Sequence, residues 1–228
     1  MKTAYAAVIC ILAFLFGACV TGDEITSYVI DPDGSVAFSI YRLNLTSDQT
    51  GEKAKEELAN YIRDLEKQSD DFFTKLAEAN AKDVKATILR SAAPASVLIT
   101  GNIPSLNDLA TYSSSKNDGE SFVCTPISEG RTRGIRCQYT KNPSKEKAKP
   151  EKSQAEKAQP EPAGTRANSF SETRIALAEG IFTKAQGFVI ARDKRSALLD
   201  TDTLDKMIDK WEIPSSTLLL EWQVPEVP

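Results

Sequence analysis

The thiols are the residues of this chain most able to do chemistry, because the sequence has four cysteines and no histidine. Without histidine, the commonest general base and metal ligand is missing, along with every Ser-His or Cys-His arrangement. In an oxidising compartment, an even pair such as Cys124 and Cys137 predicts a disulfide. Two cysteines without histidine do not make an ordinary zinc site. We therefore expect a structural bridge, and neither a catalytic residue, a metal ion nor a cofactor.

Three arginines, Arg131, Arg133 and Arg136, lie between or beside these two cysteines in the sequence. Arginine pairs well with carboxylates, and clustered charge on an exposed loop attracts a surface of opposite sign. We hypothesise that this loop contacts an acidic surface of a partner protein. The alternative is that the arginines only keep an exposed loop soluble.

Ser113 and Lys116 stand at the S-x-x-K spacing that penicillin-recognising enzymes use to activate a serine. In those enzymes the motif opens a buried helix and is accompanied by S-D-N and K-T-G, neither of which occurs in this chain. We expect a polar loop here, without a nucleophile.

The first 18 residues have the plan of a signal peptide. Lys2 precedes an apolar run from Ala4 to Phe16, and small Gly17 and Ala18 follow it. A membrane-spanning helix needs about 20 apolar residues, and this run is shorter. We predict that residues 1–18 direct export and are then removed.

Gly17 and Ala18 directly before Cys19 resemble the lipobox of bacterial lipoproteins. In that family the cysteine becomes the first residue and its sulfur carries a diacylglycerol, so the resemblance implies lipidation of Cys19 and attachment to the membrane. The match departs from the family at one place, since Leu15 stands four residues before the cysteine instead of three.

The alternative to lipidation is ordinary cleavage after Gly22, which would discard Cys19. Lipoproteins of this family tend to stay in the inner membrane when Asp follows the acylated cysteine, and Val20 stands there in this chain. By the same resemblance, we expect a cell-envelope protein in the outer membrane rather than the inner one.

Composition excludes one class of partner. The net charge is −4, and removal of Lys2 with the signal peptide makes it one unit more negative. Nucleic-acid binding needs a basic surface that displaces counterions, so we expect no nucleic acid. With 41% apolar and 26% charged residues, the chain is globular and long enough for one full core.

Residues 142–168 interrupt the globular pattern, because Lys, Glu, Pro, Ala and Gln dominate and no large apolar residue occurs between Tyr139 and Phe170. Such a stretch cannot bury enough surface to fold. We predict a disordered insertion that serves as a soluble connection, with a docking segment for a partner as the alternative.

Runs that alternate apolar and polar residues predict antiparallel strands. The first two, 25–31 and 35–43, flank Asp31-Pro32-Asp33-Gly34, in which proline fixes φ and glycine takes the left-handed corner of a turn. A second hairpin is expected from 121–126 and 134–139, joined by the loop 128–132, and a second tight turn is expected at Glu179-Gly180. The remaining predicted strands and the two of that hairpin span 95–103, 121–126, 134–139, 169–178, 181–192 and 217–224.

Between residues 50 and 86 the apolar residues recur three and four apart, which predicts one long helix. Short helices are expected at 105–110 and 203–211. Together these elements predict an α+β fold, with a mainly antiparallel sheet packed against one long helix and two short helices.

The predicted organisation is a signal peptide at 1–18, a lipidated tether at 19–24 and a single α+β domain at 25–228. We expect a non-enzymatic binding module whose partners are the membrane, through the lipid on Cys19, and another envelope protein. The alternative is a periplasmic carrier or sensor that holds a small apolar ligand between the long helix and the sheet.

Overall fold

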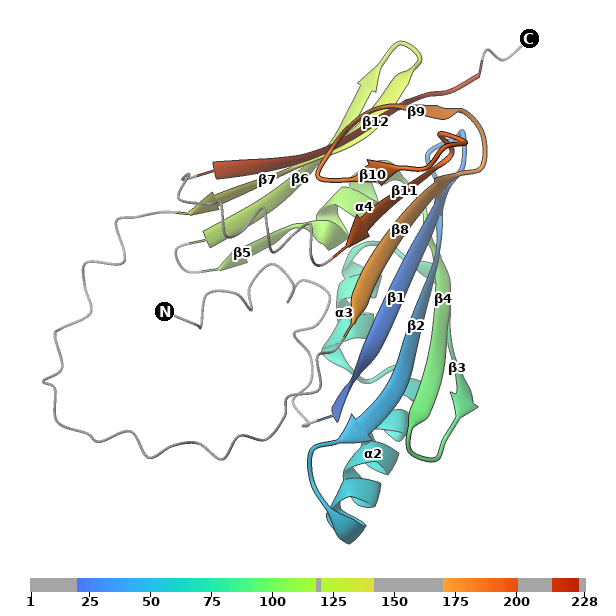
Figure 1. The fold of residues 1–228 in the computed structure, drawn as a ribbon, viewed down its shortest axis with the longest axis vertical. Helices are drawn as coiled ribbons and strands as arrows, with labels where there is room; N and C mark the ends of the chain where they lie inside the picture. The colour runs from blue at the N-terminus through green and yellow to red at the C-terminus, as the bar shows by residue number, and fades with distance from the viewer. Residues whose placement is uncertain (1–19, 118–119, 142–169, 201–214, 226–228) are drawn as a thin grey trace, which may run out of the picture.

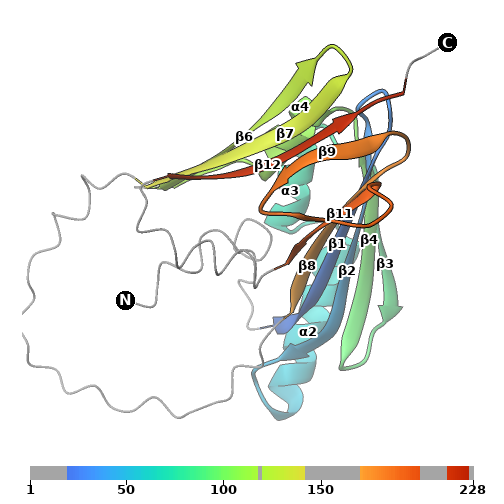
Figure 2. The same cartoon turned by 45° about the horizontal axis from the view of Figure 1, so that its top comes forward.

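A computed structural model describes residues 20–117, 120–141, 170–200 and 215–225 (Figure 1). In this part of the chain twelve strands form two sheets, and three helices pack beside them. The seven-stranded sheet has the order β10-β11-β8-β1-β2-β4-β3, and the five-stranded sheet has the order β5-β6-β7-β12-β9. The five-stranded sheet crosses one end of the seven-stranded sheet (Figures 1 and 2).

The strands of the seven-stranded sheet are β1 (Val20–Ile30), β2 (Val36–Ser47), β3 (Lys82–Arg90), β4 (Ala95–Ile103), β8 (Ser171–Leu177), β10 (Val189–Ile190) and β11 (Ser196–Asp200). Those of the five-stranded sheet are β5 (Ser115–Asn117), β6 (Glu120–Glu129), β7 (Thr132–Lys141), β9 (Ile181–Gln186) and β12 (Ser215–Gln223). The helices are α2 (Gly51–Glu66), α3 (Asp71–Glu78) and α4 (Leu106–Ser113).

The first predicted hairpin is confirmed by β1 and β2, which pair antiparallel across the turn at residues 31–34. The amide of Asp31 donates to the carbonyl of Ser35, and Gly34 has a φ of 90°, a conformation that glycine adopts without steric cost. The alternation of β2 places Val36, Phe38 and Ile40 on the buried face. This hairpin forms the centre of the larger sheet.

Strand β1 begins earlier than the alternation indicates. Val20 is its first residue and is 1% exposed, so residues 20–24, assigned above to the tether, belong to the sheet. A Cβ at Gly22 would lie 2.6 Å from the carbonyl oxygen of Leu43, so the missing side chain lets β1 approach β2. A register shift between Thr21 and Asp23 breaks the alternation that would reveal the strand in the sequence.

The long helix predicted at 50–86 is wrong, because the segment forms α2, α3 and the start of β3. Gln68 and Asn80 have φ values of 53°, which no α-helix continues through. The apolar stripe itself is correct, since Leu58, Leu65 and Leu76 are all buried. The two helices share one apolar face, and the periodicity cannot show that a turn separates them.

The short helix predicted at 105–110 is confirmed and extends to Ser113 as α4. The side chain of Ser105 caps it by accepting a hydrogen bond from the amide of Asp108. The next residues, Ser114 to Asn117, end the helix and form β5, so the S-x-x-K sequence does not open a helix.

The second predicted hairpin is confirmed by β6 and β7, which pair antiparallel. The two strands predicted on either side of Glu179-Gly180, in contrast, do not pair with each other. Strand β8 pairs parallel with β1 in the larger sheet, whereas β9 pairs with β12 in the smaller one. The turn between them carries the chain from one sheet to the other. A Cβ at Gly180 would lie 2.2 Å from the carbonyl oxygen of Gln223, so the crossing requires glycine at this position.

The predicted α+β class is therefore corrected to a mainly β fold of two sheets. Helices α2 and α3 lie along one face of the larger sheet, and α4 lies where the two sheets meet (Figure 1). One hydrophobic cluster joins both sheets, from Val36 and Ile99 to Leu220 and Trp222. The apolar stripe shared by α2 and α3 has the period of one dominant helix, and no local pattern in residues 169–192 marks the division of this segment between two sheets.

The signal peptide, Cys19, the whole 142–168 insertion and the helix predicted at 203–211 lie outside the described residues. The last predicted strand is confirmed as β12. None of the helices in the described ranges combines the length and the apolar character that a membrane span requires.

Candidate functional site

The predicted disulfide is present. Cys124 on β6 and Cys137 on β7 are direct register partners, with Cα atoms 3.9 Å apart and an S–S distance of 2.10 Å. Both residues are buried and belong to the core cluster. The bridge links two neighbouring strands of the five-stranded sheet on the side that faces the core.

The three arginines predicted as a partner contact do not form one surface. Arg131, in the β6–β7 turn, donates from Nε to the carbonyl of Val224 at 3.2 Å. Arg133 donates from Nη1 to the carbonyl of Gly130 at 2.7 Å, within the same turn. Arg136 is exposed in the middle of β7 and faces away from buried Cys137. Residues three apart on a strand lie on opposite faces, so Arg136 is separate from Arg133.

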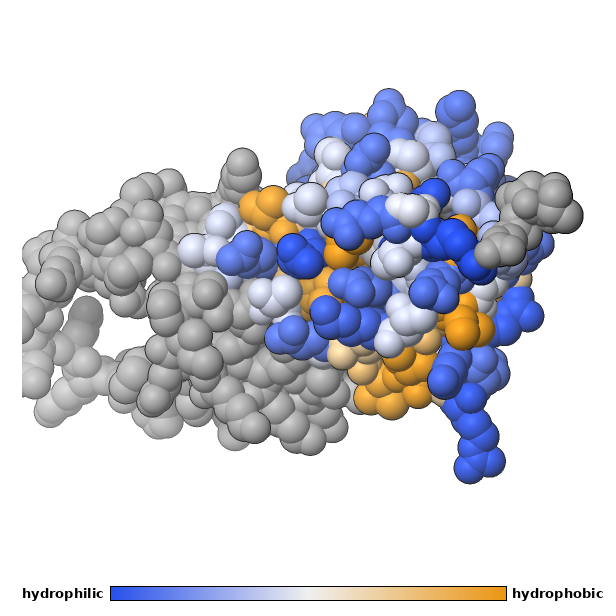
Figure 3. Space-filling model, turned by 90° about the horizontal axis from the view of Figure 1, so that it is seen from above, coloured by the Kyte–Doolittle hydropathy of each residue, from blue (hydrophilic) through white to orange (hydrophobic). Residues whose placement is uncertain are grey.

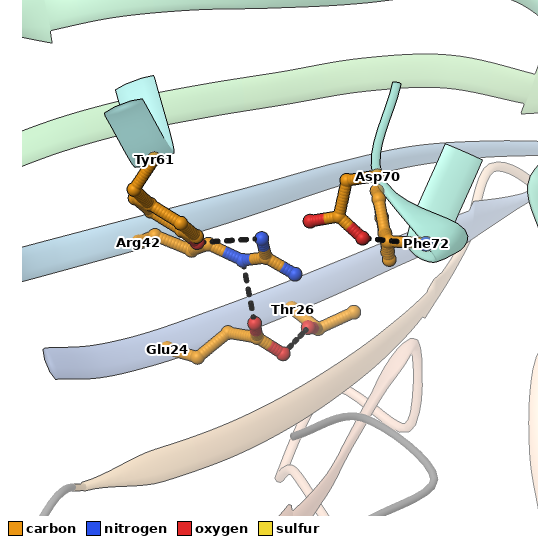
Figure 4. Close-up of polar contacts among 6 residues, drawn as sticks. All are labelled: Glu24, Thr26, Arg42, Tyr61, Asp70 and Phe72. Atoms are coloured by element: carbon orange, nitrogen blue, oxygen red, sulfur yellow. Dashed lines mark hydrogen bonds and ion pairs between the residues drawn. The ribbon is translucent and has the colours of Figure 1, made fainter. Parts of the chain in front are cut away.

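A buried ion pair that the sequence analysis did not identify lies on the inner face of the larger sheet (Figure 4). Glu24 on β1 and Arg42 on β2 are register partners, and Arg42 Nε lies 3.1 Å from Glu24 Oε2. The two side chains are 15% and 5% exposed. Charged residues are rarely buried this far unless they are paired, and here the pairing is direct.

Helices α2 and α3 close over this pair. Arg42 Nη1 donates to the hydroxyl of Tyr61 on α2 at 2.8 Å, and the guanidinium carbon lies 4.8 Å from the ring centroid of Phe72 on α3. Thr26 Oγ1 donates to the second carboxylate oxygen of Glu24 at 3.4 Å. Arg42 therefore joins both strands of the central hairpin to both helices.

Asp70 positions one side of this cluster. Its Oδ1 accepts a hydrogen bond from the amide of Phe72 at 2.8 Å and caps the N-terminus of α3 (Figure 4). Because the cap fixes where α3 begins, it also fixes the Phe72 ring against the guanidinium of Arg42. The local sequence thus determines the contact between helix and sheet.

Burial dominates the electrostatics of the cluster. Desolvation raises the pKa of Glu24 above its ordinary value, and the charge and hydrogen bond of Arg42 oppose that rise without cancelling it. Burial also raises the pKa of Tyr61 to about 12, although Arg42 acts in the opposite direction. Arg42 is the group that limits the free-energy cost of burying the Glu24 carboxylate. Removal of Arg42 should therefore lower the stability of the fold.

The cluster is built to hold the fold together. In the described residues, no buried side-chain nitrogen or oxygen lacks a hydrogen-bond partner. The polar atoms of Glu24 and Arg42 are engaged with each other and with Tyr61 and Thr26. No group of three or more Cys, Asp or Glu side chains that could hold a metal ion occurs in the ranges described above.

One signal in the sequence pointed to this pair. Arg42 follows Val36, Phe38 and Ile40 at a spacing of two, so it lies in phase with the apolar face of β2. A charged residue in that phase has to be buried with a partner. The partner could not be identified from the sequence, because Glu24 falls in the part of β1 that the alternation misses.

No family model matches the chain, and no curated protein matches it. Among solved structures, the chain is similar to the folded domain of the Mycobacterium tuberculosis protein LppM, determined by NMR. The sequence identity is 10%, the alignment covers 90% of this chain and 93% of that chain, and the TM-score is 0.42. Similarity at this level does not establish a shared fold and assigns no function.

Proposed function

We propose that the mature protein is an exported cell-envelope protein, held at the membrane by a lipid on Cys19, whose β domain binds another envelope protein. The observation that carries the proposal is the bridge between Cys124 and Cys137 in a chain that begins with the plan of a signal peptide. Disulfides form and persist outside the cytosol, so the bridge supports the export that the N-terminus predicts.

Binding is favoured over catalysis because the strongest electrostatic cluster is closed. Glu24 and Arg42 are directed at each other beneath α2 and α3, where a substrate would have to displace both helices to reach them. The burial of these two charges is explained by their contact with each other and by the packing of α2 and α3. The usual inference that a buried charge marks an active site is therefore weaker here.

The outer face of the larger sheet is one contact surface that fits this function. Tyr41 on β2 is 38% exposed, and its register partners on either side are Ile25 of β1 and Leu98 of β4. Helices α2 and α3 cover the opposite face. A row of three apolar side chains across three strands gives a protein partner a flat area to pack against.

The five-stranded sheet offers a second contact surface. From above, the described surface is mostly hydrophilic, with hydrophobic residues gathered in smaller areas (Figure 3). Arg136 is exposed on this sheet and is the one member of the predicted arginine contact that lies in mid-strand. An acidic partner surface would meet it there.

The anchor is tested by metabolic labelling with a radioactive fatty acid. The wild-type protein should incorporate label, and Cys19→Ala should lose it completely. Cys10→Ala is the matched control, because it removes another cysteine from the same N-terminal region and should retain the label. Label that persists in Cys19→Ala would refute the lipid anchor.

The partner is tested by cross-linking in intact cells and capture from solubilised envelope. Tyr41→Ser and Arg136→Ala each change one exposed side chain, so both variants should fold. Loss of a defined cross-linked band in one of them identifies the surface that the partner uses. Unchanged capture by both variants would exclude these two surfaces. Residence in the outer membrane, and the alternative function as a carrier of an apolar ligand, stay predictions.

A further inference from the structure

The attachment point of the proposed lipid is set by the start of β1. Val20 is 1% exposed and pairs with Ser47 of β2, so the residue bonded to Cys19 is packed in the sheet. Consecutive Cα atoms are about 3.8 Å apart across a trans peptide bond. No length of chain therefore separates the lipidated residue from the domain, and one end of the larger sheet is fixed close to the bilayer.

Strand register identifies which other residues share this end of the sheet. Ser47 is level with Val20, and Ala95 of β4 pairs with Leu45, two residues earlier on β2. The turn that joins β3 to β4, residues 91–94, continues from Ala95 in the direction of the Val20 end (Figure 1). Its apex is therefore level with Val20 and lies two to three strands from β1, or about 10–14 Å at the usual strand spacing.

Exposed apolar side chains lie on both sides of β1 near this end, from the level of Val20 to about that of Asp23. Leu89 on β3 is 52% exposed, and Ala92, Ala93 and Pro94 in the turn are exposed as well.

On the other side of β1, Phe170 is 47% exposed. It is held beside the start of β1 by two hydrogen bonds, from its amide to Asp23 Oδ1 and from the amide of Glu24 to its carbonyl, both 2.9 Å. We name this set the anchor rim, which consists of Leu89, Ala92, Ala93, Pro94 and Phe170.

We propose that the anchor rim lies in the lipid headgroup region when Cys19 is lipidated, so that the larger sheet stands with this end on the bilayer. The proposal rests on the proposed function, because it needs the lipid on Cys19. The headgroup region is about 5–8 Å deep on each side of the hydrocarbon. Phenylalanine and leucine are residues that partition into this region, and the covalent anchor places them there at no further entropic cost of association.

Charge at this end is nearly balanced. Arg90 at the end of β3 is basic, as are Lys53 and Lys55 in the first turns of α2, while Asp48, Glu52 and Glu56 are acidic, and all six are exposed. The contact therefore depends on the apolar side chains and does not require anionic lipid. The opposite end of β1, at Ile30, is about 34 Å from Val20 at the usual rise of an extended strand, well beyond the headgroups.

The test uses the full lipidated chain in phosphatidylcholine vesicles. Ala92→Cys carries an environment-sensitive nitrobenzoxadiazole dye in the rim, and Glu179→Cys carries it at the far end. Glu179 is a matched control because it is exposed and follows Ala178, whose amide donates to the carbonyl of Ile30. Cys124 and Cys137 are bridged and do not react with the dye.

Spin-labelled lipid should quench the dye at position 92 several-fold more than the dye at position 179, and aqueous iodide should show the reverse order. Equal quenching at both positions in a protein whose mass includes the lipid would overturn the orientation alone. A mass without lipid on Cys19 would overturn the proposed anchor, and the orientation with it. Changing Leu89→Ser together with Phe170→Ser should reduce the lipid quenching at position 92, and no reduction would also count against the rim.

Discussion

Replacing Arg42 with methionine is the sharpest test of the buried cluster. Methionine keeps most of the length and packing of the side chain but removes the charge, so Glu24 remains buried without its partner. Removal of one member of a buried ion pair destabilises proteins by about 3–5 kcal/mol, because the remaining charge has lost its compensation. The side chains of Arg42 and Glu24 are 5% and 15% exposed, so solvent screens the change little. We expect the free energy of unfolding to fall by that amount at pH 7.

The loss should depend on pH in a known direction. Burial already raises the pKa of Glu24 above its ordinary value of 4.5, and Arg42→Met removes the group that limits the rise. At pH values between the pKa of Glu24 in the unfolded chain and its higher pKa in the folded protein, the folded protein binds more protons than the unfolded chain. The free energy of unfolding therefore falls as pH rises through this range. The variant should therefore regain stability from pH 7 to pH 5, with a slope of at most about 1.4 kcal/mol per pH unit for one group. The wild type should show the same sign with a smaller slope.

Urea unfolding at both pH values, followed by tryptophan fluorescence, to which buried Trp222 contributes, measures these quantities. The control is the double variant Arg42→Met with Glu24→Gln, which removes both charges and should recover most of the loss and all of the added slope. The reasoning would be refuted by a loss below about 1 kcal/mol in Arg42→Met, the value typical of an exposed ion pair. A double variant no more stable than the single one would contradict it equally.

Two further stability predictions follow from single contacts. The Cys124–Cys137 bridge joins residues 13 apart in the sequence, and for a loop of this length chain entropy gives a stabilisation of about 3 kcal/mol. Reductant should therefore lower the melting temperature of the wild type by about 6–12 °C. It should leave the melting temperature of the double variant Cys124→Ala/Cys137→Ala unchanged. An equal shift in both proteins would rule out the bridge as its cause. Asp70→Ala removes the cap of α3 and should lower the free energy of unfolding, measured by chemical denaturation, by about 1 kcal/mol. Asp71→Ala, which changes an exposed residue in the first turn, should lower it less. Equal decreases in the two variants would show that the cap is not responsible.

Alternation predicted the strands whose two faces differ in polarity. The hairpin of β1 and β2 and strand β12 follow from the sequence, because a period of two and a well-formed turn are local properties. The disulfide follows from the even pair of cysteines expected in an oxidising compartment. The start of β1 was missed where Gly22 and a register shift disturb the period. The helix predicted at 50–86 is too long because α2 and α3 bury one apolar stripe, which continues across the turn at Gln68 without a break in its period.

The sequence by itself determined which thiols pair and which residues of the central hairpin face the core. Tertiary structure alone decided that β8 and β9 belong to different sheets, that Arg42 meets Glu24 beneath two helices, and that the three arginines separate. The physical reason is the range of the interactions. Turns, caps and periodicity act within a few residues, whereas strand pairing and buried charges join segments far apart in the chain, and their energies depend on which surfaces exclude water.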